Sequence, residues 1–171
     1  MSFIPSISLK DENVVQQIQE ACIEFGFFYL TDHGISNMLR EQVYAQMKTF
    51  FELPTDVKMK SAVDTTFRGY TPLFEETLDP DTQSTGDTKE GFYIGRHVPE
   101  ESEEALLPLH GPNQYPDATL VPLFKPTFDT YFMEMTHLAH TVAALIGEAA
   151  GASQVFAQEG TFDKYVLKDI L

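Results

Sequence analysis

The chain has 171 residues, of which 43% are apolar and 22% are charged, and this composition predicts a globular protein of one domain, or one domain with an appendage. Its formal net charge of −15 disfavours nucleic-acid binding, because an acidic surface repels the phosphate backbone. One cysteine excludes an internal disulfide, and neither a secretory signal nor a run of about 18 apolar residues is found. We therefore expect a cytoplasmic protein that does not cross a membrane.

The N-terminal part of the chain predicts a short extended segment, a helix and a buried strand. Residues 4–9 read as extended, and apolar residues then recur at helical spacing over residues 14–25, up to the stop signal Gly26. Cys22 falls on this apolar stripe, so we expect a packed thiol rather than a reactive one. Residues 27–30 are all apolar or aromatic, which predicts a strand that is buried on both faces.

The middle of the chain predicts a second helix and two strands separated by an acidic loop. The helix runs from about Ser36 to Pro54, and the strands cover residues 68–71 and 91–94. Between Glu75 and Glu104 the sequence carries about ten carboxylates and only two basic residues. We interpret this stretch as a solvated loop, and an acidic docking patch is the alternative.

The longest predicted element is a helix over residues 123–150, where apolar residues keep helical spacing for more than six turns. A strand is predicted at 165–169, close to the last residue of the sequence, Leu171. Since a strand needs a neighbouring strand, this position suggests that part of a sheet is missing.

A search for chemistry in the residues alone finds no specific signal. None of the five histidines begins a His-x-Asp or His-x-Glu pair. His137 and His140 are three residues apart on the long predicted helix, and we interpret them as facing solvent, with a metal site as the alternative. The sequence has no nucleophile elbow, no phosphate-binding glycine loop and no dinucleotide fingerprint. These residues indicate an acidic α+β domain and nothing more.

Five short strings, taken in order along the chain, carry a family resemblance. They are ACIEFGFFYLTDHGI at 21–35, FFELP followed by Lys58, RGY at 68–70, DTKEGFYIG at 87–95 and GPNQYP at 111–116. Together they resemble the N-terminal domain of the non-haem iron(II)/2-oxoglutarate-dependent dioxygenases of the isopenicillin N synthase-like type. Asp32 stands where the family usually has asparagine, a change that the turn can accept.

The resemblance implies a fold and a cofactor set. Residues 1–116 would form the dioxygenase N-terminal domain, and residues 117–171 would form the long helix and the lead-in to a jelly-roll (double-stranded β-helix) core that is incomplete or absent here. Complete members hold iron(II) with two histidines and one carboxylate, and bind 2-oxoglutarate through an arginine. None of these ligands can be assigned in this sequence, so we predict no catalytic, cofactor-binding or metal-binding residue in the chain.

Three residues remain candidates for the substrate pocket of a complete enzyme: Arg68, Tyr70 and Phe92. Arg68 and Tyr70 lie in the RGY string, at the point where family members line the pocket from the N-terminal side, and Phe92 lies on the next strand. For Tyr70 the alternative is an aromatic side chain packed in the core. Lys89 and Glu90 are expected to form at most an ion pair at the rim.

Two functions from different classes follow. The first is the N-terminal portion of an oxidoreductase that acts on a small organic substrate and is inactive alone, because the iron ligands are absent. The second is a stand-alone binding or regulatory module that has lost catalysis. For the first function, an incomplete core would leave apolar surface uncovered, so we expect either a marginally stable monomer or self-association that strengthens with salt. A stably folded monomer that salt does not change would favour the second function.

Overall fold

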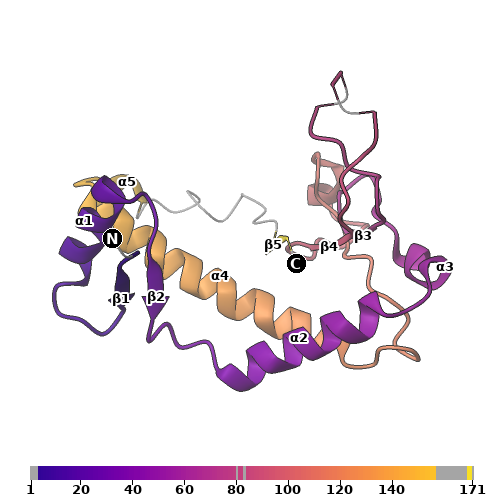
Figure 1. Cartoon of the computed structure of the whole chain (residues 1–171), viewed down its shortest axis with the longest axis horizontal. Helices are drawn as coiled ribbons and strands as arrows, with labels where there is room; N and C mark the ends of the chain where they lie inside the picture. The colour runs from indigo at the N-terminus through magenta and orange to yellow at the C-terminus, as the bar shows by residue number, and fades with distance from the viewer. Residues whose placement is uncertain (1–3, 80, 83, 157–168, 171) are drawn as a thin grey trace. The chain divides into compact units, whose positions relative to one another are not determined.

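A computed structural model describes residues 4–79, 81–82, 84–156 and 169–170, and it shows a mixed α/β chain (Figure 1). The described residues form two compact units, one made of 4–36 with 133–156 and the other of 37–132 with 169–170. No helix in the described part is long and apolar enough to span a bilayer. The strands of these residues form one two-stranded and one three-stranded sheet, and no closed barrel.

The order of the elements follows the sequence prediction closely. They are β1 (Ser6–Ser8), α1 (Val14–Glu24), β2 (Tyr29–Thr31), α2 (Asn37–Phe51), α3 (Thr55–Lys58), the 3-10 helix η1 (Met59–Ser61), β3 (Gly69–Thr71), β4 (Gly91–Ile94), the 3-10 helix η2 (Glu103–Leu106), α4 (Phe124–Ala149), α5 (Ser153–Phe156) and β5 (Asp169–Ile170).

The first unit is a parallel pair of strands with a helical layer. β1 and β2 pair so that Ile7 lies opposite Leu30. The helix α1 ends where Gly26 takes a positive φ of 78°, a conformation that glycine adopts without strain, so the predicted stop is confirmed. A small cluster forms the core of this unit: buried Ile7, Ile18 and Ala21, with Val14, Phe28, Leu145, Ile146 and Ala149 packed against them.

Two predictions for this unit are wrong, and both concern burial. Cys22 is exposed, because α1 buries Ile18 and Ala21 and the next residue points about 100° further round the helix. The strand begins at Tyr29 instead of residue 27, and it is not buried on both faces, since Phe27 is 58% exposed and Tyr29 is 62% exposed. A two-stranded sheet covered on one side cannot bury both faces of either strand.

The second unit has an aromatic core between helices and sheet. The ring of Phe50 on α2 meets that of Phe92 on β4 edge to face at 5.0 Å, and Phe92 meets Phe124 at the start of α4 at 5.0 Å. Edge-to-face pairs of this kind contribute about 0.5–1.5 kcal/mol each beyond the burial of area. The predicted long helix is confirmed as one helix, and Pro126 lies in its first turn, where a missing N–H is tolerated.

The sheet of the second unit confirms two predicted strands. β3 runs antiparallel to β4 with Tyr70 opposite Phe92, and β4 pairs antiparallel with β5, where Ile94 lies opposite Asp169. The predicted strand at 165–169 lies outside the described residues except for its last residue, which belongs to β5. Figure 1 shows the chain between β3 and β4 extending well beyond the two strands.

Candidate functional site

The pair β3–β4 has two faces with different surroundings. Side chains alternate along a strand, so Tyr70 and Phe92, which lie opposite each other, share one face, and Thr71 and Tyr93 belong to the other. The first face packs on the aromatic ring of Phe50, with Tyr70 at 5.7 Å and Phe92 at 5.0 Å between ring centroids. Any small molecule that reaches these strands in this unit must therefore approach the second face.

An ionic triad made of buried Lys58, buried Tyr70 and partly exposed Glu90 holds the first face in place. The Nζ of Lys58, which is only 5% exposed, donates to Oε2 of Glu90 at 2.6 Å and to the carbonyl of Phe51 at 3.1 Å. The hydroxyl of Tyr70 donates to the same Glu90 oxygen at 2.5 Å. Burial acts to raise the pKa of Glu90, but the hydrogen bonds from Lys58 and Tyr70 outweigh it and hold that pKa below its ordinary value. Burial and the hydrogen bond to Glu90 raise the pKa of Tyr70 far above its usual range.

The triad corrects the expected ion pair between Lys89 and Glu90. Glu90 pairs with Lys58, and the Nζ of Lys89 lies 2.6 Å from a carboxylate oxygen of Glu76. Lys58 and Glu90 belong to two different strings of the family resemblance and are 32 residues apart. The strings indicate that both residues matter, but only the fold shows that they are partners.

Arg68 is buried and links separate segments of the chain through hydrogen bonds. Its Nη1 donates to the carbonyls of Leu109 at 2.7 Å and Thr66 at 3.1 Å, and its Nη2 donates to the carbonyl of Arg96 at 3.2 Å. Its Nε has no hydrogen-bond partner among the described residues. A Cβ atom on Gly95 would lie 2.9 Å from that Nε, so this glycine leaves room for the guanidinium and for little else. Burial lowers the pKa of the guanidinium.

The three residues that the sequence predicts for the substrate pocket are therefore all buried in the second unit. Arg68, Tyr70 and Phe92 are each 1% exposed. None of them lines the cavity on the second face of β3. Their contact with a substrate stays a prediction for a complete enzyme.

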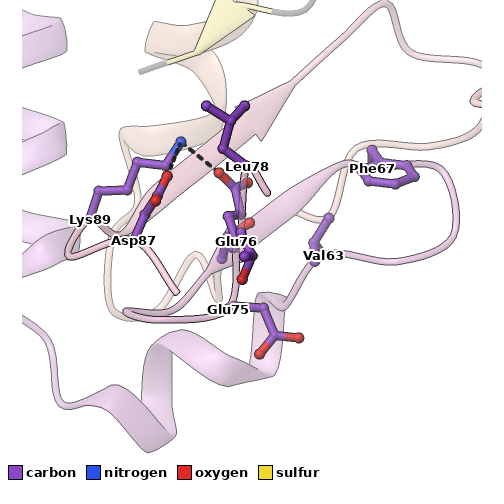
Figure 2. Close-up of a pocket in the computed structure, with 9 residues that line it drawn as sticks. Val63, Phe67, Glu75, Glu76, Leu78, Asp87 and Lys89 are labelled. Carbon is purple, nitrogen blue, oxygen red and sulfur yellow. Dashed lines mark ion pairs between the residues drawn. The ribbon is translucent and has the colours of Figure 1, made fainter. Parts of the chain in front are cut away.

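That second face borders a cavity of about 490 Å³ (Figure 2). Lys89 contacts two carboxylates there, Glu76 at 2.6 Å and Asp87 at 3.9 Å, and Phe67 and Val63 lie across from it. The lining combines apolar, hydroxyl and charged side chains: Val63, Phe67, Thr71, Glu75, Glu76, Thr77, Leu78, Asp87 and Lys89.

The loop between β3 and β4 is held together at its base. The N–H of Phe74 donates to the carbonyl of Asp87 at 2.9 Å, and the N–H of Asp87 donates to the carbonyl of Glu76 at 2.7 Å. Gly86 allows this approach, because a Cβ on it would overlap the carbonyl oxygen of Phe74. The hydroxyl of Tyr93 donates to Oε1 of Glu76. The charge pattern predicts a solvated loop, yet at this base its carboxylates are fixed beside a cavity, which that pattern alone does not indicate.

The donor groups of the described residues do not fit the iron that the resemblance implies. Over 4–79, 81–82, 84–156 and 169–170, no three His, Cys, Asp or Glu side chains come together in a way that could hold a metal ion. His137 and His140 lie on α4 and are both exposed, in agreement with the solvent-facing interpretation. No catalytic step through a metal can therefore be derived from this part of the chain.

Comparison with known families decides the identity of the chain. Residues 4–118 match the family model described as the N-terminal domain of the non-haem dioxygenase in morphine synthesis. The chain belongs to the non-haem dioxygenase family. The resemblance stated from the five strings is thereby confirmed.

Relatives of this chain include a plant and a fungal protein. It is 34% identical over 139 residues to azadirone synthase LFS of Melia azedarach, a match that covers 81% of this chain and 42% of that enzyme. It is 35% identical over 144 residues to the 2-oxoglutarate-dependent dioxygenase caaD of Aspergillus niger, covering 83% of this chain and 43% of that enzyme. The chain thus spans less than half the length of these curated relatives.

Solved structures agree on the fold. A full-length protein of Neurospora crassa, solved in complex with alpha-KG, superposes with a TM-score of 0.70 at 25% identity, over 88% of this chain and 48% of that one. The rice dioxygenase for auxin oxidation superposes with a TM-score of 0.59 at 21% identity, over 87% of this chain and 46% of that one, and shows the fold alone. The mixed α/β arrangement of this chain is therefore also found in the matching parts of these two proteins.

Proposed function

We propose that this chain is the N-terminal portion of an iron(II)/2-oxoglutarate-dependent oxidoreductase that acts on a small organic substrate, and that it does not turn over 2-oxoglutarate alone. The observation that carries the proposal is the pattern of coverage. Relatives named as 2-oxoglutarate-dependent dioxygenases match 83% and 92% of this chain but only 43% and 47% of their own length. Iron(II) and 2-oxoglutarate would then be bound by the remainder of the complete enzyme.

The sheet β3–β4–β5 supports a role beside a catalytic core. Its first face is closed by the helices, while its second face carries Thr71 and Tyr93 and borders the cavity. We propose that this sheet extends the jelly-roll of the complete enzyme, with residues 1–116 as the N-terminal domain and 117–171 as the lead-in. The family match over residues 4–118 supports the placing of that boundary.

In this proposal, three buried residues support the wall of the substrate pocket without lining it: Arg68, Tyr70 and Phe92. Tyr70 and Phe92 are buried on the side of the sheet that packs on Phe50, and buried Arg68 holds neighbouring loops through the carbonyls of Thr66, Arg96 and Leu109. We propose that they keep the pocket wall in place in the complete enzyme.

The charge of the chain bears on its surroundings. At a formal net charge of −15 it repels nucleic acid, and its single cysteine suits a reducing compartment, so we propose a cytoplasmic enzyme with a small molecule as its partner.

The transcript that encodes the chain provides the test of the proposal. We expect the reading frame to continue past Leu171 and to encode a His-x-Asp pair followed by a distal histidine, since two histidines and a carboxylate are the iron ligands of such oxygenases. A stop codon directly after Leu171 in the mature transcript would instead favour the non-catalytic binding module.

A further inference from the structure

We propose that the loop between β4 and α4 carries a docking surface for a basic amphipathic segment of another protein. The surface is the leucine loop, made of Leu106, Leu107, Pro108 and Leu109, together with the exposed carboxylates that precede it. The proposal goes beyond the proposed function, because it assigns a protein partner in addition to a substrate. It is carried by the exposure of the loop, by the contacts that hold it and by the charge beside it.

The leucine loop exposes an uninterrupted run of apolar side chains. Leu106 is 85% exposed, Leu107 is 53% exposed and Leu109 is 44% exposed, and Pro108 between them is exposed as well. One exposed leucine is ordinary on a protein surface, but a run of three or four exposed apolar residues is avoided unless it serves a function. Contiguous apolar surface of this kind marks sites of interaction with other proteins.

Hydrogen bonds hold the leucine loop in one conformation. The buried guanidinium of Arg68 donates to the carbonyl of Leu109 at 2.7 Å, and the N–H of His110 donates to the carbonyl of Leu107 at 3.2 Å. Leu109 has a positive φ of 64°, which is unfavourable for a side chain of this size and persists only where the surroundings fix it. Because the loop is already ordered, a partner that packs on the leucines loses little binding free energy to ordering.

Carboxylates without an ion pair lie next to the leucine loop. Glu100, Glu101 and Glu103 are exposed, and none of them pairs with a basic side chain among the described residues. Glu103 and Leu106 are the first and last residues of η2, and side chains three residues apart in a 3-10 helix lie on the same side. Negative charge therefore borders the apolar run at η2.

This charge decides which occupant fits the surface. Lysine or arginine side chains beside apolar anchors complement both parts of it, and opposite charges speed the encounter of two proteins. A second copy of the chain would instead set carboxylates against carboxylates, with a net charge of −15 on each copy. Nucleic acids and anionic membranes are repelled in the same way. The fitting partner is a protein segment with apolar side chains on one face and basic residues at its flanks.

The test measures the binding of three labelled synthetic peptides to the full chain by fluorescence anisotropy at low salt. The first is an amphipathic helix of leucine and lysine about four turns long. The second has the same residues in an order that spreads the leucines around the helix, and the third has glutamate in place of lysine. We expect the first to bind at least about 10-fold more tightly than the second, and the third not to bind. Equal binding of the first two peptides would overturn the proposal, since charge alone would then account for it.

Leucine variants locate the binding. Leu106→Ser and Leu107→Ser should each weaken the amphipathic peptide by about 5-fold or more, because each removes an exposed apolar anchor. The matched control is Leu123→Ser, the same change at a leucine that is 59% exposed elsewhere in the second unit, and it should leave binding unchanged. An equal loss in the control would refute the site. If a variant does not fold, amide NMR shifts of the unmodified chain decide the question, and shifts that spare residues 100–109 would refute the site.

A charge variant tests the carboxylates separately. Glu103→Gln should weaken the amphipathic peptide several-fold, and this loss should shrink as salt is added. The matched control is Glu41→Gln, the same change at an exposed glutamate of α2, and it should have no effect. Equal losses for the two variants would show a general charge effect and refute the docking surface.

Two other occupants give different outcomes. If Leu107→Ser abolishes self-association of the chain in sedimentation at low salt, a second copy covers the leucine loop and the proposal is wrong. If the peptide binds the chain alone but not the protein extended by the segment that its transcript encodes after Leu171, the remainder of the enzyme covers the loop and the proposal is also wrong. Peptide binding by both proteins, with self-association unchanged by Leu107→Ser, supports the proposal.

Discussion

Replacing Lys58 by methionine tests whether the ionic triad holds β3 and β4 in place. The change removes the 2.6 Å contact to Glu90 and the 3.1 Å hydrogen bond to the carbonyl of Phe51, and it keeps most of the apolar stem. Of the two groups in the triad that donate to the Glu90 carboxylate, only the hydroxyl of Tyr70 then remains, in a site where the Glu90 side chain is 27% exposed.

The magnitude follows from how far that carboxylate is buried. Breaking a fully buried pair costs about 3–5 kcal/mol, and the partial exposure of Glu90 places the expected loss nearer about 2–3 kcal/mol. Adding Glu90→Gln to Lys58→Met removes the unpaired charge, while the amide oxygen can still accept from Tyr70. We therefore expect a coupling energy of about 1–2 kcal/mol between the two sites.

The assay is urea unfolding of the four proteins of this double-mutant cycle, followed by circular dichroism. The control is Lys89→Met, whose pair with Glu76 is half exposed and should change stability by less than about 1 kcal/mol. A loss below about 1 kcal/mol for Lys58→Met, or additive single changes, would refute the reasoning.

Three further predictions concern pH, packing and association. Because the pKa of Glu90 is lowered in the folded chain, its carboxylate stabilises the fold above the ordinary carboxyl pKa, and this effect is lost as the pH falls through the lowered pKa. The urea midpoints of the unmodified chain and of Glu90→Gln should therefore converge in acid. A constant difference between the two midpoints would contradict this. Gly86→Ala places a Cβ against the carbonyl of Phe74 and should destabilise the chain by about 1–3 kcal/mol in the same unfolding assay. An unchanged urea midpoint would refute the packing. Sedimentation across a salt series should show association that strengthens with salt, because screening weakens the repulsion set by the charge of −15; a salt-independent monomer would argue against uncovered apolar surface.

The sequence predicts those features that depend on local pattern. The helix over 123–150 follows from apolar spacing alone, and the structure shows it as Phe124–Ala149. Strands at 68–71 and 91–94 follow in the same way, since β3 and β4 are flanked by clear turn signals.

Prediction from the sequence fails where a feature depends on which residues the fold brings together. Cys22 has the spacing of a buried residue, but α1 buries only a narrow face, which contains Ile18 and Ala21. The pairing of Lys58 with Glu90 joins two strings 32 residues apart, which no local pattern encodes. The candidate site escapes prediction for the same reason, because Thr71 and Asp87 come together only through the hydrogen-bonded base of the loop.

Succinate formation from 2-oxoglutarate tests the central claim most directly. The chain alone, and the chain extended by the segment that its transcript encodes after Leu171, are each incubated with iron(II), ascorbate and 2-oxoglutarate. We predict no succinate above a no-protein control for the chain alone, and succinate from the extended protein, because positioned ligands with open coordination sites are needed for turnover. Succinate from the chain alone, lost when iron is chelated, would contradict the account.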